Sequence, residues 1–193
     1  MRKPFFSRKA VAILSVALLA ASLYPLFHIA LYNHPFYDDL GYSLLTHPAW
    51  RETGSVFSVV AAAWRNTVGI RQTWQGWYTA AFISAMQPGV FGEGLYPAAT
   101  FLLLGAFLLA LGFFLWQIIG KLFRAGRPSF WICFSGLAFL MVQFVPNAAE
   151  AFFWFNSGAI YTLMYALSLV AAGLWIRLSL CGKRTTLSSM EGQ

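Results

Sequence analysis

Four long apolar stretches divide the chain, and each one is a candidate membrane-spanning helix. They run over residues 10–31, 96–119, 130–146 and 160–180. A hydrocarbon core of ~30 Å is crossed by about 20 apolar residues of helix. The second and third stretches carry no charge, and the fourth holds only Arg177, close enough to its end for the side chain to reach the interface. We therefore predict an all-α integral membrane protein with four transmembrane helices in a single membrane domain, residues 1–193.

A long segment, residues 32–95, separates the first two spans and has its own pattern. It is too long for a bare connection, because structureless loops of that length are uncommon in compact domains. Ser55 can cap a helix with one apolar stripe, and a second stripe follows. The stripes are Val56, Val59, Val60, Ala63 and then Trp74, Tyr78, Phe82, Ala85. The pattern predicts an outer subdomain of amphipathic helices, which either lies among the lipid headgroups or packs as a lid on the spans.

Charge gives the chain an orientation. Only 10% of the residues are charged, against the roughly 25% usual in soluble domains. All four lysines fall in residues 1–9, 121–127 and 177–184, which an even number of spans places on one side. Because short cytoplasmic segments are rich in lysine and arginine, we predict that both termini are cytoplasmic, residues 181–193 forming a tail, and that residues 32–95 lie outside. The net charge of +7 then reflects topology, and no nucleic-acid partner is expected.

The pair Asp38–Asp39 stands where the first span ends, in a chain with six acidic residues. Ionised groups are costly beside hydrocarbon, so such a pair marks a candidate functional site. On a regular helix the two carboxylates point about 100° apart, and they converge only if the backbone turns, as Pro35 and Gly41 would permit. Converging oxygens can bind a divalent cation such as Mg²⁺ or Mn²⁺. Alternatively, one carboxylate acts as a general base, or the pair only caps an interfacial helix.

Other polar side chains could complete such a site. Arg65 and Arg71 flank the aromatic stretch and either clamp a phosphate or contact lipid headgroups. Glu150, Asn156 and Tyr161 either form a second polar edge facing the two aspartates or are ordinary solvated loop residues. The sequence alone leaves both alternatives open.

The runs YDDLGYS and WQGWYTAAFISAMQPG, placed after a first anchored span, resemble the amino-terminal part of the GT-C membrane glycosyltransferases, in particular an incompletely characterised bacterial group. The resemblance covers about residues 1–165. It implies catalytic or metal-binding roles for Asp38 and Asp39, a polyprenyl-phosphate-linked sugar as donor, and transfer with inversion. It also implies a place in the bacterial inner membrane, serving the cell envelope.

The number of spans departs from that family, whose members usually have more than seven. We therefore expect a truncated or split glycosyltransferase whose further helices come from a partner chain. The alternative is a noncatalytic four-span protein, either a flippase-type carrier of lipid-linked sugars or an assembly subunit.

Overall fold

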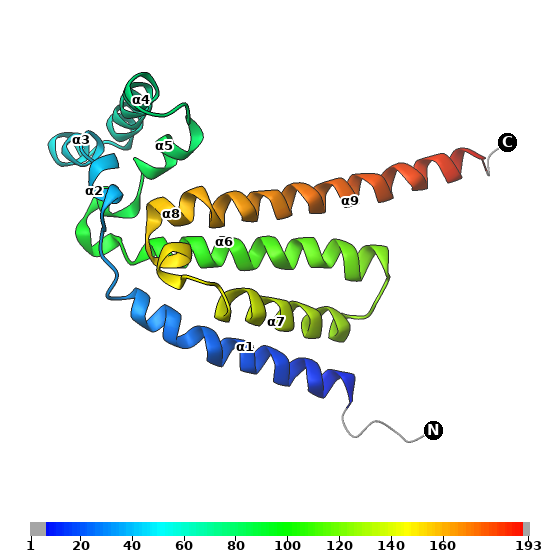
Figure 1. The fold of residues 1–193 in the computed structure, drawn as a ribbon. Helices are drawn as coiled ribbons and strands as arrows, with labels where there is room; N and C mark the ends of the chain where they lie inside the picture. The colour runs from blue at the N-terminus through cyan, green and yellow to red at the C-terminus, as the bar shows by residue number, and fades with distance from the viewer. Residues whose placement is uncertain (1–6, 191–193) are drawn as a thin grey trace. The chain divides into compact units, whose positions relative to one another are not determined.

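The computed structural model describes residues 7–190, with side chains described as far as Cys181, and this part of the chain contains helices and no strand (Figure 1). The α-helices are α1 (Arg8–Ala30), α2 (Asp38–Tyr42), α3 (Thr46–Thr53), α4 (Val56–Thr73), α5 (Thr79–Ser84), α6 (Ala98–Leu115), α7 (Arg127–Gln143), α8 (Phe155–Ile160) and α9 (Thr162–Met190). Two 3₁₀-helices, η1 (Pro88–Phe91) and η2 (Glu93–Leu95), and two π-helices, η3 (Trp116–Leu122) and η4 (Ala149–Phe153), complete the set.

Three helical stretches are long and apolar enough to cross a membrane. They are Arg8–Ala30, Glu93–Leu122 and Phe155–Cys181, and they coincide with three of the four predicted spans. The all-α fold is thus confirmed for the described residues, and three of the predicted spans coincide with helices of suitable length and composition. The span predicted over residues 130–146 corresponds to α7, which has 17 residues, and it stays a prediction.

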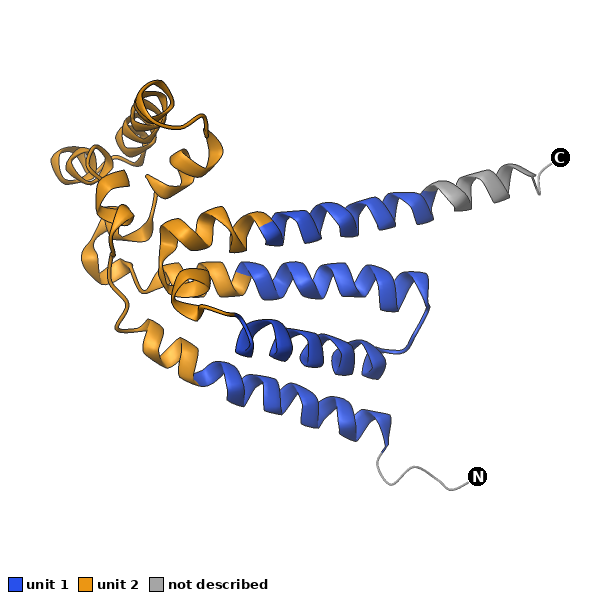
Figure 2. Ribbon diagram, viewed as in Figure 1, with its two compact units in different colours: residues 1–24, 106–145, 165–193 blue, residues 25–105, 146–164 orange. Residues whose placement is uncertain are grey.

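The chain forms two compact units, drawn in blue and orange in Figure 2. The first consists of residues 1–24, 106–145 and 165–193. In it, Gln143 of α7 donates a hydrogen bond to the Ser22 carbonyl of α1 at 2.9 Å. On the other side, the ring of Phe107 in α6 stacks on Tyr165 of α9 at 6.2 Å. Ring contacts and a side-chain hydrogen bond therefore join neighbouring helix segments within this unit.

The second unit consists of residues 25–105 and 146–164 and contains every residue of the candidate site. Its buried core is Tyr96, Ala99, Leu103, Phe155 and Ala159, from the start of α6 and from α8. Gly158 allows the two helices to approach, because a Cβ there would collide with the Leu103 side chain and lie 3.1 Å from the Ala151 carbonyl.

The outer segment differs from its predicted stripes. Helix α4 begins directly after Ser55, as expected, but the Ser55 side chain makes no capping hydrogen bond. Its buried residues are Val59, Ala62, Ala63 and Thr67, whereas Val56 and Val60 of the predicted stripe are exposed. The packed face of α4 is therefore rotated from the predicted one.

The prediction of a single helix over the second stripe, from Trp74 to Ala85, is wrong. Helix α4 ends at Thr73, and α5 begins only at Thr79. The intervening turn returns the chain to α4, where Tyr78 stacks on Trp64 with ring centres 6.4 Å apart. The Arg71 guanidinium lies 4.7 Å from the centre of the same Tyr78 ring. Aromatic and cation–π contacts with α4 therefore replace the continuous helix that the spacing suggested.

Candidate functional site at the carboxylate pair

The backbone turns directly before the two aspartates, at Tyr37. This residue has φ 49°, which is uncommon outside glycine, asparagine and aspartate and costs on the order of 1–3 kcal/mol. The turn therefore occurs at Tyr37 rather than through Pro35 or Gly41. Helix α2 begins at Asp38, and the two adjacent carboxylates differ in burial: Asp39 is fully buried and Asp38 is partly exposed.

Asp39 is held from three directions. Its Oδ2 accepts hydrogen bonds from the Tyr96 hydroxyl and from the Phe36 backbone N–H, the latter at 3.2 Å. Its Oδ1 accepts a third from the Asn156 backbone N–H at 2.9 Å. The Tyr96 oxygen in turn accepts the Phe155 N–H at 3.0 Å. The carboxylate thus joins α2 to the segment before α6 and to α8.

Burial raises the pKa of the Asp39 carboxyl above its ordinary value, because removal from water disfavours the charged form. The three hydrogen bonds oppose this rise in pKa, and the nearby charge of Asp38 adds to it. Because Asp39 is fully buried and both of its oxygens accept hydrogen bonds from the protein, neither oxygen is exposed to a substrate. The geometry of Asp39 is that of a structural anchor.

Asp38 is linked to this anchor through Asn156. The Asn156 Nδ2 donates to Asp38 Oδ2 at 3.3 Å, while its Oδ1 accepts the Ser84 hydroxyl at 2.5 Å. Because the ionised Asp38 carboxylate can only accept, the Asn156 Nδ2 must face it, and the Asn156 Oδ1 is then the atom that faces Ser84. Among the residues that the structure describes, Asp38 Oδ1 has no partner, so this atom is the one carboxylate oxygen of the pair open to a ligand.

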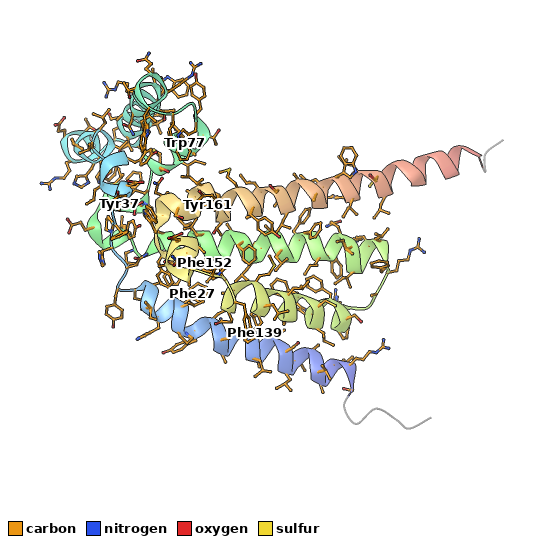
Figure 3. All side chains as sticks on the ribbon, viewed as in Figure 1. Phe27, Tyr37, Trp77, Phe139, Phe152 and Tyr161 are labelled. Atoms are coloured by element: carbon orange, nitrogen blue, oxygen red, sulfur yellow. The ribbon has the colours of Figure 1, made fainter. Side chains whose placement is uncertain are left out.

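Aromatic side chains form a cluster on segments next to the aspartates and Asn156 in the sequence. The rings of Phe36 and Tyr37 lie 5.9 and 6.1 Å from that of Trp154, both edge to face. Tyr37 is 70% exposed, and Figure 3 shows it on the connection between α1 and α2. The buried Trp154 Nε1 has no acceptor within residues 7–181. The site thus combines a carboxylate, exposed aromatic surface and a spare N–H donor.

The structure brings together three of the predicted site residues: Asp38, Asp39 and Asn156. Arg65, Glu150 and Tyr161 are exposed, and no hydrogen bond or ion pair joins them to the aspartates within the described side chains. Arg71 lines a separate hollow of about 410 Å³ with Trp64 and Tyr78. Of the residues predicted to form a polar edge facing the aspartates, Asn156 is therefore the one that contacts them within the described side chains.

Tyr96 and Ser84 belong to the site and were not anticipated. A tyrosine at the start of an apolar span usually indicates an interfacial aromatic belt, so its hydroxyl gave no sign of a carboxylate partner 57 residues away. Ser84 lies within an apolar stretch, and its partner Asn156 is 72 residues later. The sequence indicated only that a buried aspartate would need hydrogen-bond donors, and it did not indicate which residues would supply them.

The two carboxylates differ in what they offer a cation. Cation binding needs free oxygens, and those of Asp39 already accept hydrogen bonds. Within the described residues, no group of three histidine, cysteine or acidic side chains gathers around a common point. Only one carboxylate oxygen, from Asp38, is open to a cation.

No protein-family model, curated protein or solved structure matches this chain.

Proposed function

We propose that this protein transfers a sugar from a polyprenyl-phosphate donor to a hydroxyl acceptor at the outer face of the membrane, with Asp38 as the general base. The open Asp38 Oδ1 beside a locked Asp39 supports this proposal most directly. The site lies in the unit that includes the segment between two helices long enough to span a bilayer. Such a place suits a donor whose lipid stays in the membrane.

The proposed reaction needs one base and one leaving group. The acceptor hydroxyl loses its proton to Asp38 Oδ1 as its oxygen forms a bond to the anomeric carbon. The bond from that carbon to the phosphate oxygen breaks, and the polyprenyl phosphate leaves with the electron pair. Attack opposite the leaving group inverts the anomeric centre. General-base assistance of this kind typically contributes about 10²–10⁴-fold in rate.

The neighbouring residues support that role of Asp38. Asn156 fixes one oxygen of the carboxylate and leaves the other open, which orients the base before substrate binds. Phe36 and Tyr37 offer exposed ring surface beside it. Arg71, in its aromatic hollow, is the cation we assign to the donor phosphate, since a guanidinium suits bidentate contact.

The remaining features of the proposal concern context. We propose four spans with both termini cytoplasmic, the outer segment against the lipid headgroups, and a place in the bacterial inner membrane. A partner chain supplies further helices. These assignments rest on the distribution of lysine and arginine and on the resemblance to the GT-C enzymes.

The alternative is a noncatalytic carrier or assembly subunit, and one observation favours it. The Asp39 network joins three segments of the second unit and would do so whether or not any reaction takes place. In that alternative Asp38 is a solvated helix-terminal residue, and its substitution has no chemical consequence.

A detergent extract distinguishes transfer from transport, because a micelle has no opposite leaflet. Membranes of cells that lack the gene should accumulate donor and retain acceptor. Adding the purified chain, with any chain that copurifies, to a detergent extract of these membranes should restore the glycan product, measured by mass. If intact cells need the protein for the product but the extract forms it equally well without the protein, the carrier function is correct instead.

A further inference from the structure

A second hollow adjoins the carboxylate site through α2. Its volume is about 490 Å³, within the roughly 300–1,000 Å³ of small-molecule sites. Leu40 of α2 and Ser43, the residue directly after α2, line it, and Asp38 begins the same helix. Because α2 has only five residues and a helix rises 1.5 Å per residue, the whole helix that links Asp38 to this lining is about 7 Å long.

Gln87 provides a fixed donor to this hollow. The residue is 2% exposed, and its Oε1 accepts the Gly89 N–H at 2.6 Å, capping η1. Because the amide oxygen faces Gly89, the amide nitrogen is the polar atom of Gln87 that can donate into the hollow. Nε2 donates to no residue in the part of the chain that the structure describes. Because Nε2 is not among the buried atoms without a partner in the described residues, we read it as reaching the hollow, where a ligand can accept from it.

His47 provides a fixed acceptor. Its Nδ1 lies 3.0 Å from the Val90 carbonyl oxygen, which can only accept, so in the neutral ring Nδ1 carries the hydrogen. This contact leaves the lone pair on Nε2. Ser43 donates its hydroxyl hydrogen to the Leu40 carbonyl at 3.0 Å and also keeps oxygen lone pairs free. Both residues line the same hollow.

The charge of the lining indicates the class of ligand. Neither lysine nor arginine is among its residues, and Glu93 is the one acidic side chain. An anionic group would meet that carboxylate without a cation to compensate, unlike in the hollow that contains Arg71. Pro35 and Leu40 add an apolar wall. Separate donors and acceptors beside apolar surface suit a neutral ring that bears several hydroxyl groups.

We propose that this hollow binds a neutral sugar ring, with Gln87 Nε2 donating to one hydroxyl and His47 Nε2 accepting from another. The sugar is the acceptor of the transfer reaction, an identity that rests on the proposed function. The short α2 then presents the acceptor hydroxyl near Asp38, while the phosphate of the donor is held elsewhere.

Direct binding tests this assignment without any reaction. The full chain is purified in a zwitterionic detergent that contains no sugar, and saturation-transfer NMR is recorded with the methyl glycosides of glucose, galactose, mannose and N-acetylglucosamine. At least one probe should bind saturably. Gln87→Glu keeps the acceptor for Gly89 and removes the donor, and His47→Asn keeps a donor for Val90 and removes Nε2. Each variant should weaken binding at least tenfold.

Gln75→Glu is the matched control, because it makes the same chemical change in the α4–α5 connection, away from this hollow, and should bind like the wild type. Thermal unfolding of each variant shows whether it is folded. Absence of saturable binding by all four probes overturns the assignment, as does unchanged binding by folded Gln87→Glu and His47→Asn. Asp38→Asn should still bind the probe, so loss of transfer with retained binding separates the proposed base from this pocket.

Discussion

The hydroxyl of Tyr96 donates a hydrogen bond to the carboxylate of Asp39, a residue 57 positions earlier in the chain. Both side chains are fully buried. The bond connects α2, which carries the carboxylate pair, to the start of an apolar helix long enough to span a membrane. Asp39, and with it the adjacent Asp38, is therefore tied to the start of the long apolar helix of the same unit.

Removing that hydroxyl should destabilise the protein. Tyr96→Phe leaves the buried Asp39 with one donor fewer, and losing a hydrogen bond to a charged group costs about 1.5–3 kcal/mol. Thermal unfolding in detergent, followed by tryptophan fluorescence, should show a lower Tm. Tyr32→Phe, at a residue 74% exposed, is the control and should leave Tm unchanged. Equal Tm values for both variants would contradict the anchoring role of Tyr96.

The pH dependence of stability should change in Asp39→Asn. The folded-state pKa of Asp39 is raised, so its stabilising contribution is full below the unfolded-state pKa of about 3.9 and is lost as pH rises through the folded-state pKa. Asparagine does not titrate. As pH is raised from 4 to 8, the Tm of the wild type should therefore fall relative to the Tm of Asp39→Asn. A constant difference over this range would mean that the pKa of Asp39 is unchanged by folding.

The sequence predicted the helical class and three of the spans because twenty-residue apolar helices are set by local composition. It also located Asp38, Asp39 and Asn156, since carboxylates and amides are scarce near apolar segments. It could not pair Asp39 with Tyr96 or Asn156 with Ser84, because those partners lie far apart in sequence. The continuous helix predicted from the Trp74–Ala85 stripe does not form, because Tyr78 contacts Trp64 and Arg71 instead of continuing the helical spacing.

The close approach of α8 to α6 should make Gly158 intolerant of a side chain. Gly158→Ala places a methyl group against Leu103 and the Ala151 carbonyl, and overpacking of this kind costs about 1–3 kcal/mol. Gly69→Ala on α4 is the matched control, because nothing lies within 4 Å of its added Cβ. Tm should fall for the first variant and stay level or rise for the second. A Gly158→Ala protein as stable as Gly69→Ala would show that the helices can separate without cost.

Topology is open to a labelling test in intact cells. In a chain with Cys133→Ser and Cys181→Ser, Ser55→Cys should react with a membrane-impermeant thiol reagent, because the outer segment is predicted to face outside. Ser129→Cys, at the start of α7, should react only after lysis. The reverse pattern would invert the orientation and remove the site from the outer face.

The most direct test of the account is product formation by Asp38→Asn in the detergent extract that contains accumulated donor and acceptor. Asparagine keeps the size of the side chain and its capacity to accept from Asn156, but it cannot take a proton. We predict that Tm is unchanged and that the rate of product formation falls by about 10²–10⁴-fold. A folded Asp38→Asn protein that forms product at the wild-type rate would contradict the role of Asp38 as the base.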